Sequence, residues 1–184
     1  MSTVRLSPTS YVVLGMIALR GPSTPYALKR AVSHSVGHFW QFPHTQLYDE
    51  PVRLTDAGLL NVDSEVSGRR RKIYSITPAG LDEVRSWLGK PAGQAFEIRN
   101  IAELKLFFSE LGSSGDVKDL AAEQVGLHVR RLAEYEQMQA RFSDRADLAQ
   151  RMIPLDLGVA LERTALEFWQ GVLEGRSRQA DTAT

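Results

Sequence analysis

The segment from residue 45 to residue 80 constrains the fold of this chain more than any other stretch. A helical pattern ends at Gly58, and the residues after it alternate between apolar and polar, as in a half-buried strand. Ser67-Gly68 supplies a turn, and a second strand pattern follows it. Thr77-Pro78 then begins another helix, because a threonine can cap a helix and proline suits its first position. The segment therefore predicts a helix, a β-hairpin and a helix, in that order.

Four consecutive cations, Arg69, Arg70, Arg71 and Lys72, lie at the start of the second arm of this hairpin. A run of charge is often no more than a solvated surface. However, a basic hairpin directly after a helix that could bind in a DNA groove is typical of a winged helix-turn-helix. In that fold the helix enters the groove and the hairpin contacts phosphates. We therefore expect these four cations to contact the phosphates of double-stranded DNA.

The composition excludes several classes of function. The 184 residues carry no net charge, although basic residues are in excess in the first half and acidic residues in the second. The chain has no cysteine, no glycine-rich phosphate loop and no nucleophile elbow, so we expect neither an enzyme nor a cofactor. The longest apolar run, residues 12–19, is too short to span a bilayer, and no signal-peptide pattern is visible. We expect a soluble cytoplasmic protein with no membrane partner.

The fold class predicted is mainly α with a small β-hairpin wing, divided into two domains near residue 90, where glycine and proline interrupt both regular periods. Residues 1–90 predict a winged helix-turn-helix DNA-binding domain, and residues 91–184 predict a helical dimerisation and candidate effector domain. The helices of the first domain are predicted at residues 8–19, 25–36, 44–57 and 78–88, and three of them begin with a hydroxyl–proline pair: Ser7-Pro8, Thr24-Pro25 and Thr77-Pro78. The first helix has few polar positions, so we expect it at the centre of the core. Those of the second are predicted at residues 98–111, 116–142 and 155–173.

The predicted helix 116–142 has an apolar stripe that a small domain cannot cover alone, so it needs a partner helix from this chain or from another. We expect a homodimer. The candidate interface residues on this helix and the last one are Leu120, Leu127, Leu132, Tyr135, Met138, Phe168 and Trp169.

The candidate DNA-reading residues lie at the start of the third helix, because the N-terminal residues of that helix face base edges in a helix-turn-helix. Gln46 can read adenine in a bidentate way, and Arg53 can pair with guanine or phosphate. The alternative is an ordinary polar helix face. The remaining candidates on the second and third helices are Tyr26, Lys29, His44, Thr45 and Tyr48.

Other residues could bind a metal ion or a small molecule. His34 and His38 have a metal-binding spacing but no third ligand, so we expect capping or surface histidines and no metal site. His128, Trp40 and Trp169 are candidates to line an apolar ligand pocket, the alternative being that they belong to the core or an interface.

Several segments together form a pattern that spans about residues 6–175: Leu14-Gly15, Gly21-Pro22, Tyr26-Ala27-Leu28, Gln46-Leu47-Tyr48, Arg53-Leu54, Gly58-Leu59-Leu60, Arg71-Lys72-Ile73-Tyr74, Ile76-Thr77-Pro78-Ala79-Gly80 and Leu104-Lys105-Leu106-Phe107-Phe108. In these segments the chain resembles the PadR family of bacterial transcriptional regulators. The resemblance implies a homodimeric winged-helix regulator, usually a repressor, whose operator is approximately palindromic and whose effector, where there is one, is a small aromatic or apolar molecule.

The third helix departs from the family pattern, which has proline directly after the tyrosine and an apolar residue two positions further on. Asp49 and Pro51 occupy those positions here. An interior proline removes a helical hydrogen bond, so we predict a kink or a helix that starts late. Asp49 and Glu50 also bring negative charge near DNA. The alternative function is therefore a winged-helix module for protein–protein interaction that has lost DNA binding.

Overall fold

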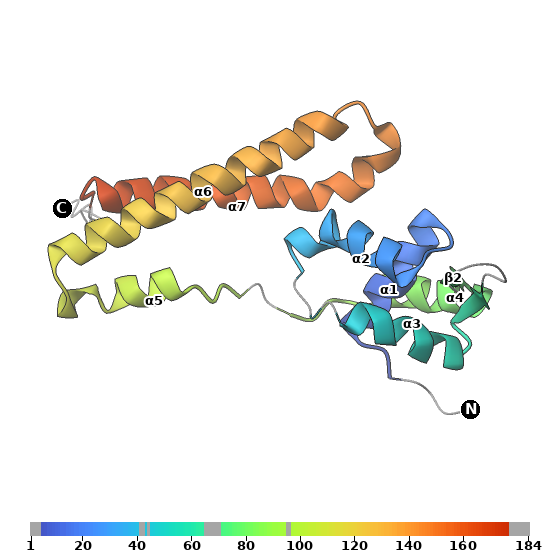
Figure 1. Ribbon diagram of the computed structural model, residues 1–184. Coiled ribbons are helices and arrows are strands. Elements are labelled where there is room, and N and C mark those ends of the chain that lie inside the picture. The colour runs from blue at the N-terminus through green and yellow to red at the C-terminus, as the bar shows by residue number, and fades with distance from the viewer. Residues whose placement is uncertain (1–4, 41–42, 44, 65–70, 95–96, 177–184) are drawn as a thin grey trace. The chain divides into compact units, whose positions relative to one another are not determined.

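The computed structural model describes residues 5–40, 43, 45–64, 71–94 and 97–176. The chain divides into two compact units, Met1–Gln94 and Ala95–Thr184, which we call the N-terminal unit and the C-terminal unit. The N-terminal unit consists of α1 (Pro8–Arg20), α2 (Pro25–Ser33), a 3-10 turn (Val36–His38), α3 (Gln46–Asp56), β1 (Leu60–Ser64), β2 (Lys72–Ile76) and α4 (Pro78–Leu88) (Figure 1).

Three helices of the N-terminal unit begin with the predicted hydroxyl cap and proline. Ser7 accepts a hydrogen bond from the backbone N–H of Ser10, Thr24 from that of Ala27, and Thr77 from that of Gly80. A cap of this kind satisfies a backbone donor that has no partner inside the helix. The sequence pattern therefore predicted where α1, α2 and α4 start.

Helix α1 forms the centre of this unit, as its nearly continuous apolar sequence predicted. Val13, Leu14 and Ile17 are almost wholly buried. Residues from α2, α3 and the hairpin pack with them in one apolar cluster, which includes Leu28, Val32, Leu47, Leu54, Leu60 and Tyr74.

The two strands pair in antiparallel register, with Leu60 opposite Ile76 and Val62 opposite Tyr74. Ser23 adds a short bridge, because its N–H donates to the carbonyl of Tyr74 and its carbonyl accepts from the N–H of Tyr74, both at 2.9 Å. The bridge fixes the start of α2 beside the second strand. The predicted turn at residues 67–68 lies outside the described residues.

Helix α3 begins at Gln46, later than the predicted start at residue 44, and continues through Pro51 to Asp56. Pro51 cannot donate to the carbonyl of Leu47. Its ring is fully buried, however, and this burial offsets part of the lost hydrogen bond. The late start was one of the two expected outcomes.

The C-terminal unit is helical throughout its described residues. It consists of α5 (Ile101–Phe107), a 3-10 turn (Ser109–Leu111), α6 (Ser114–Phe142), a 3-10 turn (Ala146–Leu148) and α7 (Ala149–Leu173). Helices α6 and α7 run side by side (Figure 1), so α7 covers part of the stripe on α6. None of the described helices is long and apolar enough to cross a lipid bilayer.

Three predicted helices had wrong boundaries. The helix predicted at residues 25–36 ends at Ser33, and the one predicted at 98–111 starts only after the cap at Asn100 and ends at Phe107, because 3-10 turns replace the remainder of both. The last helix begins at Ala149, before the predicted start at residue 155. Pro154 lies inside it and removes one internal hydrogen bond, the one that residue 154 would donate to the carbonyl of residue 150.

Replacing Gly80 by alanine should destabilise the N-terminal unit by about 1–3 kcal/mol. A Cβ atom there would lie 2.2 Å from the carbonyl oxygen of Leu59, so the backbone leading into the hairpin would have to shift. Chemical denaturation measures the free energy of unfolding. Gly89→Ala is the matched control, because its Cβ would come no closer than 3.6 Å to another atom. Equal stability of the two variants would contradict this packing.

Candidate nucleic-acid interface

Tyrosines and cations from three elements gather at the start of α2. We call this site the tyrosine–cation hollow, and it is lined by Thr24, Pro25, Tyr26, Tyr48, Arg71 and Lys72. Tyr26 is 71% exposed and Tyr48 is 45% exposed, so both rings are available to a ligand. Four of the predicted DNA-contacting residues therefore lie together, although they are far apart in the sequence.

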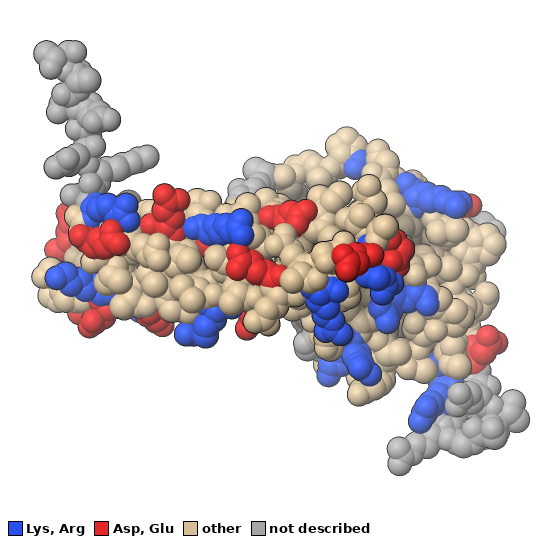
Figure 2. Space-filling view, turned by 90° about the horizontal axis from the view of Figure 1, so that it is seen from above, with Lys and Arg blue, Asp and Glu red and all other residues tan. Residues whose placement is uncertain are grey.

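The electrostatics of the tyrosine–cation hollow favour an anion. Arg71 and Lys72 are exposed, and none of the described residues that line the hollow is acidic. Thr24, Pro25 and Tyr26 line it from the N-terminal end of α2, so the positive end of the helix dipole lies beside it. Figure 2 shows lysine and arginine side chains beside aspartate and glutamate side chains over the visible face, so the basic character of the hollow is local.

Gln46 is the first residue of α3 and is exposed, as a base-reading residue must be. Its Oε1 accepts a hydrogen bond of 2.8 Å from the hydroxyl of Thr9, the second residue of α1. Thr45, the residue before the helix, is also exposed. Thr9 could not be selected from the sequence, because its contact with Gln46 spans 37 residues.

Arg53 is held by groups of its own chain. Its Nε donates to Oε2 of Glu50 at 3.0 Å, and one Nη donates to the other carboxylate oxygen. The same Nη donates to the hydroxyl of Ser10 at 2.9 Å, while the second donates to the carbonyl of Arg5 at 3.1 Å. Most of its guanidinium donors are thus engaged inside the unit. We call this group of contacts the Arg53 clamp, and it links α3 to the start of α1.

The Arg53 clamp also changes the acidity of Glu50. Burial by itself raises the pKa of the Glu50 carboxyl. Hydrogen bonds from Arg53 and Ser10, together with the charge of Arg53, lower the pKa by more than burial raises it, so the net pKa is below its ordinary value. Glu50 therefore stays ionised and neutralises Arg53. Its i, i+3 spacing from Arg53 was the sequence signal that could have found the pair.

The outward face of α3 is acidic and apolar. Asp49, Val52 and Asp56 are exposed on this face, whereas Leu47, Pro51 and Leu54 face the core. Asp49 can accept a hydrogen bond from a cytosine N4 amino group, and Val52 can contact a thymine methyl group. Neither acid favours a phosphate.

The other predicted DNA-binding residues are less informative. Lys29 is half-buried on α2 and does not line the tyrosine–cation hollow. His44, Arg69 and Arg70 lie outside the described residues.

His34, one of the two histidines with a metal-binding spacing, occupies the end of α2, where its Nδ1 lies 2.7 Å from the carbonyl of Arg30. No group of three potential metal ligands occurs among the residues that the structure describes.

The candidate effector residues lie in different surroundings. Trp40 is 43% exposed in the N-terminal unit, whereas Trp169 is 2% exposed in an apolar cluster with Ala102 and Ala121. His128 Nδ1 lies 2.6 Å from Glu162 Oε2, between α6 and α7. Its Nε2 is buried and has no hydrogen-bond partner within the described part of the chain.

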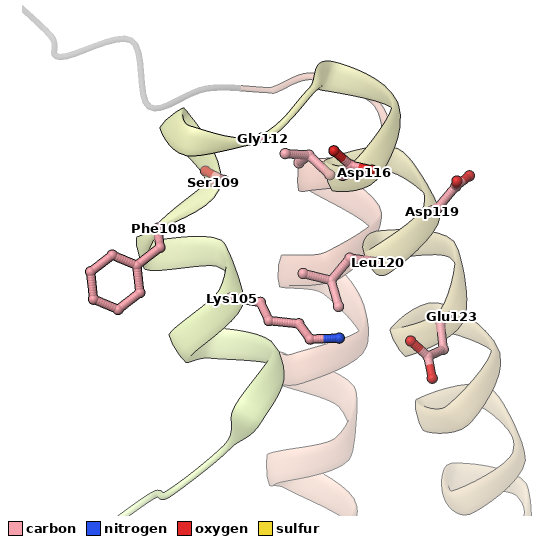
Figure 3. A pocket seen from close by; sticks show the side chains of 9 residues that line it. Lys105, Phe108, Ser109, Gly112, Asp116, Asp119, Leu120 and Glu123 are labelled. Carbon is pink, nitrogen blue, oxygen red and sulfur yellow. The ribbon is translucent and has the colours of Figure 1, made fainter.

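A second hollow lies between α5 and the start of α6 (Figure 3). Lys105 and Leu120 point into the space between these helices, and Glu123 lies nearby. Asp116 accepts hydrogen bonds from the backbone N–H and the hydroxyl of Ser113 at the cap of α6, and these hydrogen bonds lower the pKa of its carboxyl. The mixed charge of this hollow suits a phosphate less well than the tyrosine–cation hollow does.

The C-terminal unit leaves many apolar side chains exposed. Of the predicted interface residues, Leu127 is 44% and Phe168 49% exposed, whereas Tyr135 and Trp169 are buried within the chain. Leu120, Leu132 and Met138 are half-buried. Further exposed apolar residues that sequence reasoning did not select are Ile101, Leu104, Phe107, Phe108, Leu111, Val129, Ile153, Leu157 and Leu161.

Two protein families match successive parts of this chain. Residues 13–86 match the transcriptional regulator PadR-like family, and residues 98–175 match the virulence activator alpha C-terminal family. The negative transcriptional regulator PadR of Bacillus subtilis (strain 168) is 26% identical over 136 residues, which cover 71% of this chain and 74% of that protein.

Solved structures share the fold. Bacillus subtilis PadR in complex with operator DNA has a TM-score of 0.83 at 21% identity, over 93% of this chain and 100% of that chain. The same protein in complex with p-coumaric acid has a TM-score of 0.76 at 19% identity, over 93% of this chain and 98% of that chain. These similarities confirm the predicted winged-helix fold with a C-terminal helical region.

The Arg53 clamp predicts a pH-dependent loss of stability in Glu50→Gln. At neutral pH this variant should unfold more easily than the wild type by about 1 kcal/mol, because the partly exposed ion pair is lost. Since the fold lowers the pKa of Glu50, the carboxylate contributes stability above the unfolded-state pKa and loses it as the pH falls through the folded-state pKa.

Denaturation curves from neutral to strongly acidic pH should therefore converge for the wild type and Glu50→Gln. Glu83→Gln, on the exposed surface of α4, is the control and should follow the wild type at every pH. A difference between Glu50→Gln and the wild type that is constant with pH would contradict the role of the charge.

Proposed function

We propose that this chain is a sequence-specific DNA-binding regulator in the cytoplasm, because residues 13–86 match the PadR-like family, whose members are transcriptional regulators and not enzymes. In this proposal it is a homodimeric repressor that a small aromatic or apolar ligand releases from an approximately palindromic operator. The observation that carries the proposal is the tyrosine–cation hollow, which lies beside the exposed first turn of α3.

In the proposed complex, residues 1–90 bind DNA and the first turn of α3 enters the major groove. Thr45 and Gln46 then face base edges, while Tyr26, Tyr48, Arg71 and Lys72 contact the sugar–phosphate backbone. Because the guanidinium donors of Arg53 are engaged in its clamp, its main role is to hold α3 rather than to read a base. The two tasks of positioning and reading thus fall to different residues.

Residues 91–184 form the dimer in this proposal. The exposed apolar side chains of the C-terminal unit support it, because a monomer rarely leaves so many large apolar groups in water. Leu127 and Phe168 would lie in the interface, beside the half-buried Leu120, Leu132 and Met138. Tyr135 and Trp169 would support it from within, since both are already buried by their own chain.

The proposed effector would bind the C-terminal unit near His128. The buried Nε2 of His128 supports this, because a buried polar atom without a partner is costly unless a ligand or another chain supplies one. The relative whose structure was solved with p-coumaric acid is consistent with a small aromatic effector. Trp169 contributes through its buried cluster, whereas Trp40 belongs to the N-terminal unit and is not part of this proposed site.

A second candidate function is a protein–protein module without DNA binding. The observation that favours it is the outward face of α3, where Asp49 and Asp56 would repel phosphates and Arg53 is already paired. This function predicts no retention of duplex DNA at physiological salt. DNA binding that depends on the cations of the tyrosine–cation hollow would decide against it.

Replacing Arg71 and Lys72 together by alanine should weaken binding to every duplex alike. Each lost phosphate contact should reduce the slope of log affinity against log salt by about 0.9, so the double variant should lose about 1.8. Fluorescence anisotropy across a salt series measures the slope. The control is Arg85→Ala with Lys90→Ala. It removes the same charge from two exposed residues, one in α4 and one just after it, that do not line the hollow. An unchanged slope in the first variant would contradict the phosphate assignment.

Sedimentation at micromolar concentration should find the wild type as a dimer of about twice 20.5 kDa. Leu127→Lys should shift it toward monomer without loss of helicity, because a charge would have to be buried in the proposed interface. Leu88→Lys is the control, since Leu88 is 69% exposed on α4 of the N-terminal unit. A monomeric wild type would overturn the dimer.

A further inference from the structure

The contact between Thr9 and Gln46 joins the central helix of the N-terminal unit to the first residue of α3. The hydroxyl of Thr9 donates to Gln46 Oε1 at 2.8 Å. Thr9 is 7% exposed, whereas Gln46 is exposed. A rigid, buried donor therefore holds a flexible side chain at the surface where bases are proposed to be read.

We infer that Thr9 is a positioning residue that sets the orientation of the Gln46 amide and thereby the base preference of the protein. The inference rests on the proposed DNA-binding function. Thr9 itself touches no base in this arrangement, because its side chain is buried between α1 and α3.

The chemistry of the glutamine amide explains why its orientation matters. A glutamine side chain has an acceptor oxygen and a donor nitrogen, and rotation about its last torsion exchanges them. Donation by Thr9 fixes the oxygen toward α1, which leaves the Nε2 hydrogens for an acceptor on a base. Oε1 keeps a second lone pair, so the bidentate contact with adenine N6 and N7 remains available in one orientation.

The tether should also reduce the entropy lost when DNA binds. Glutamine has several rotatable bonds, and immobilising such a side chain at an interface lowers affinity. A hydrogen bond from a buried residue restricts this freedom before DNA arrives. The effect should appear only on a duplex that Gln46 reads, because a nonspecific duplex is held through its phosphates.

The nearby Arg53 clamp is a second link between α1 and α3, and the test must distinguish its effect on helix docking from the effect of Thr9 on Gln46. It also links α1 to α3, but it acts through Ser10, Glu50 and the carbonyl of Arg5. Loss of Thr9 leaves all those groups in place. A change in α3 docking would weaken binding to every duplex, whereas a change in Gln46 alone would affect selectivity.

The test compares Thr9→Val, which removes the hydroxyl at nearly constant shape, with Thr9→Ser, which keeps it. The probe is a duplex that the wild type enriches from a randomised pool, measured beside a shuffled duplex of the same composition. We expect Thr9→Val to lower the affinity ratio between the two duplexes by about three- to tenfold. Thr9→Ser should keep most of the ratio, and affinity for the shuffled duplex should be unchanged in both variants.

A double-mutant cycle with Gln46→Ala tests whether Thr9 acts through Gln46. In the Gln46→Ala background, Thr9→Val should have no further effect on the ratio. A full ratio in Thr9→Val, or an undiminished effect of Thr9→Val in that background, would overturn the inference. Thermal unfolding of each variant establishes a temperature at which all are folded.

The outcomes separate this inference from the function on which it rests. If the wild type enriches no sequence, the proposed function fails and the inference fails with it. If the wild type is selective and Gln46→Ala is not, the proposed function stands, and the ratio of Thr9→Val alone then decides the inference. If Gln46→Ala stays as selective as the wild type, the inference is wrong although the regulator still reads DNA.

Discussion

Helix α3 is fixed against α1 both by apolar packing and by polar contacts. On its inner face Leu47, Pro51 and Leu54 are buried in the core around Val13, Leu14 and Ile17. At its edge the Arg53 clamp and the Thr9–Gln46 hydrogen bond connect it to the first turn of α1. Packing supplies most of the stability, because it removes apolar area from water, whereas the polar contacts fix the rotation of the helix.

This attachment determines which groups remain for DNA. Arg53 is the one basic residue within α3, and it is engaged by Glu50, Ser10 and the backbone of Arg5. The positive charge of the interface must therefore come from neighbouring elements. The bridge between Ser23 and Tyr74 brings the start of α2 beside β2, which places Tyr26 with Arg71 and Lys72. An acidic α3 and a basic hairpin are thus parts of one arrangement, in which, under the proposed function, bases and phosphates would be contacted by different elements.

The local parts of this fold could be predicted from the sequence. Hydroxyl–proline pairs gave the starts of three helices, and alternating residues gave the hairpin, because both signals depend on near neighbours. The early start of α7 was missed, because the helix continues through Pro154 despite the hydrogen bond that an interior proline removes. The full Arg53 clamp was also missed. Its partners Ser10 and Arg5 lie 43 and 48 residues away, where sequence spacing carries no information about contact.

The candidate site likewise combines residues that could be predicted from the sequence with contacts that could not. Tyr26, Tyr48, Arg71 and Lys72 were selected from sequence, and the structure places them in one hollow. The partners that α1 supplies to Gln46 and Arg53 could not be chosen in advance, because many polar groups of the chain were equally plausible. Thr9 and Ser10 became visible only when α1 and α3 were seen together.

The most direct test of the central claim is the selectivity of the wild-type protein at physiological salt. Fluorescence anisotropy should compare a duplex that the protein enriches from a randomised pool with a shuffled duplex of the same composition. We predict that the preference for the enriched duplex persists at physiological salt, because base contacts do not depend on counterion release. Failure to enrich any sequence, or equal and salt-sensitive binding to both duplexes, would contradict sequence-specific regulation.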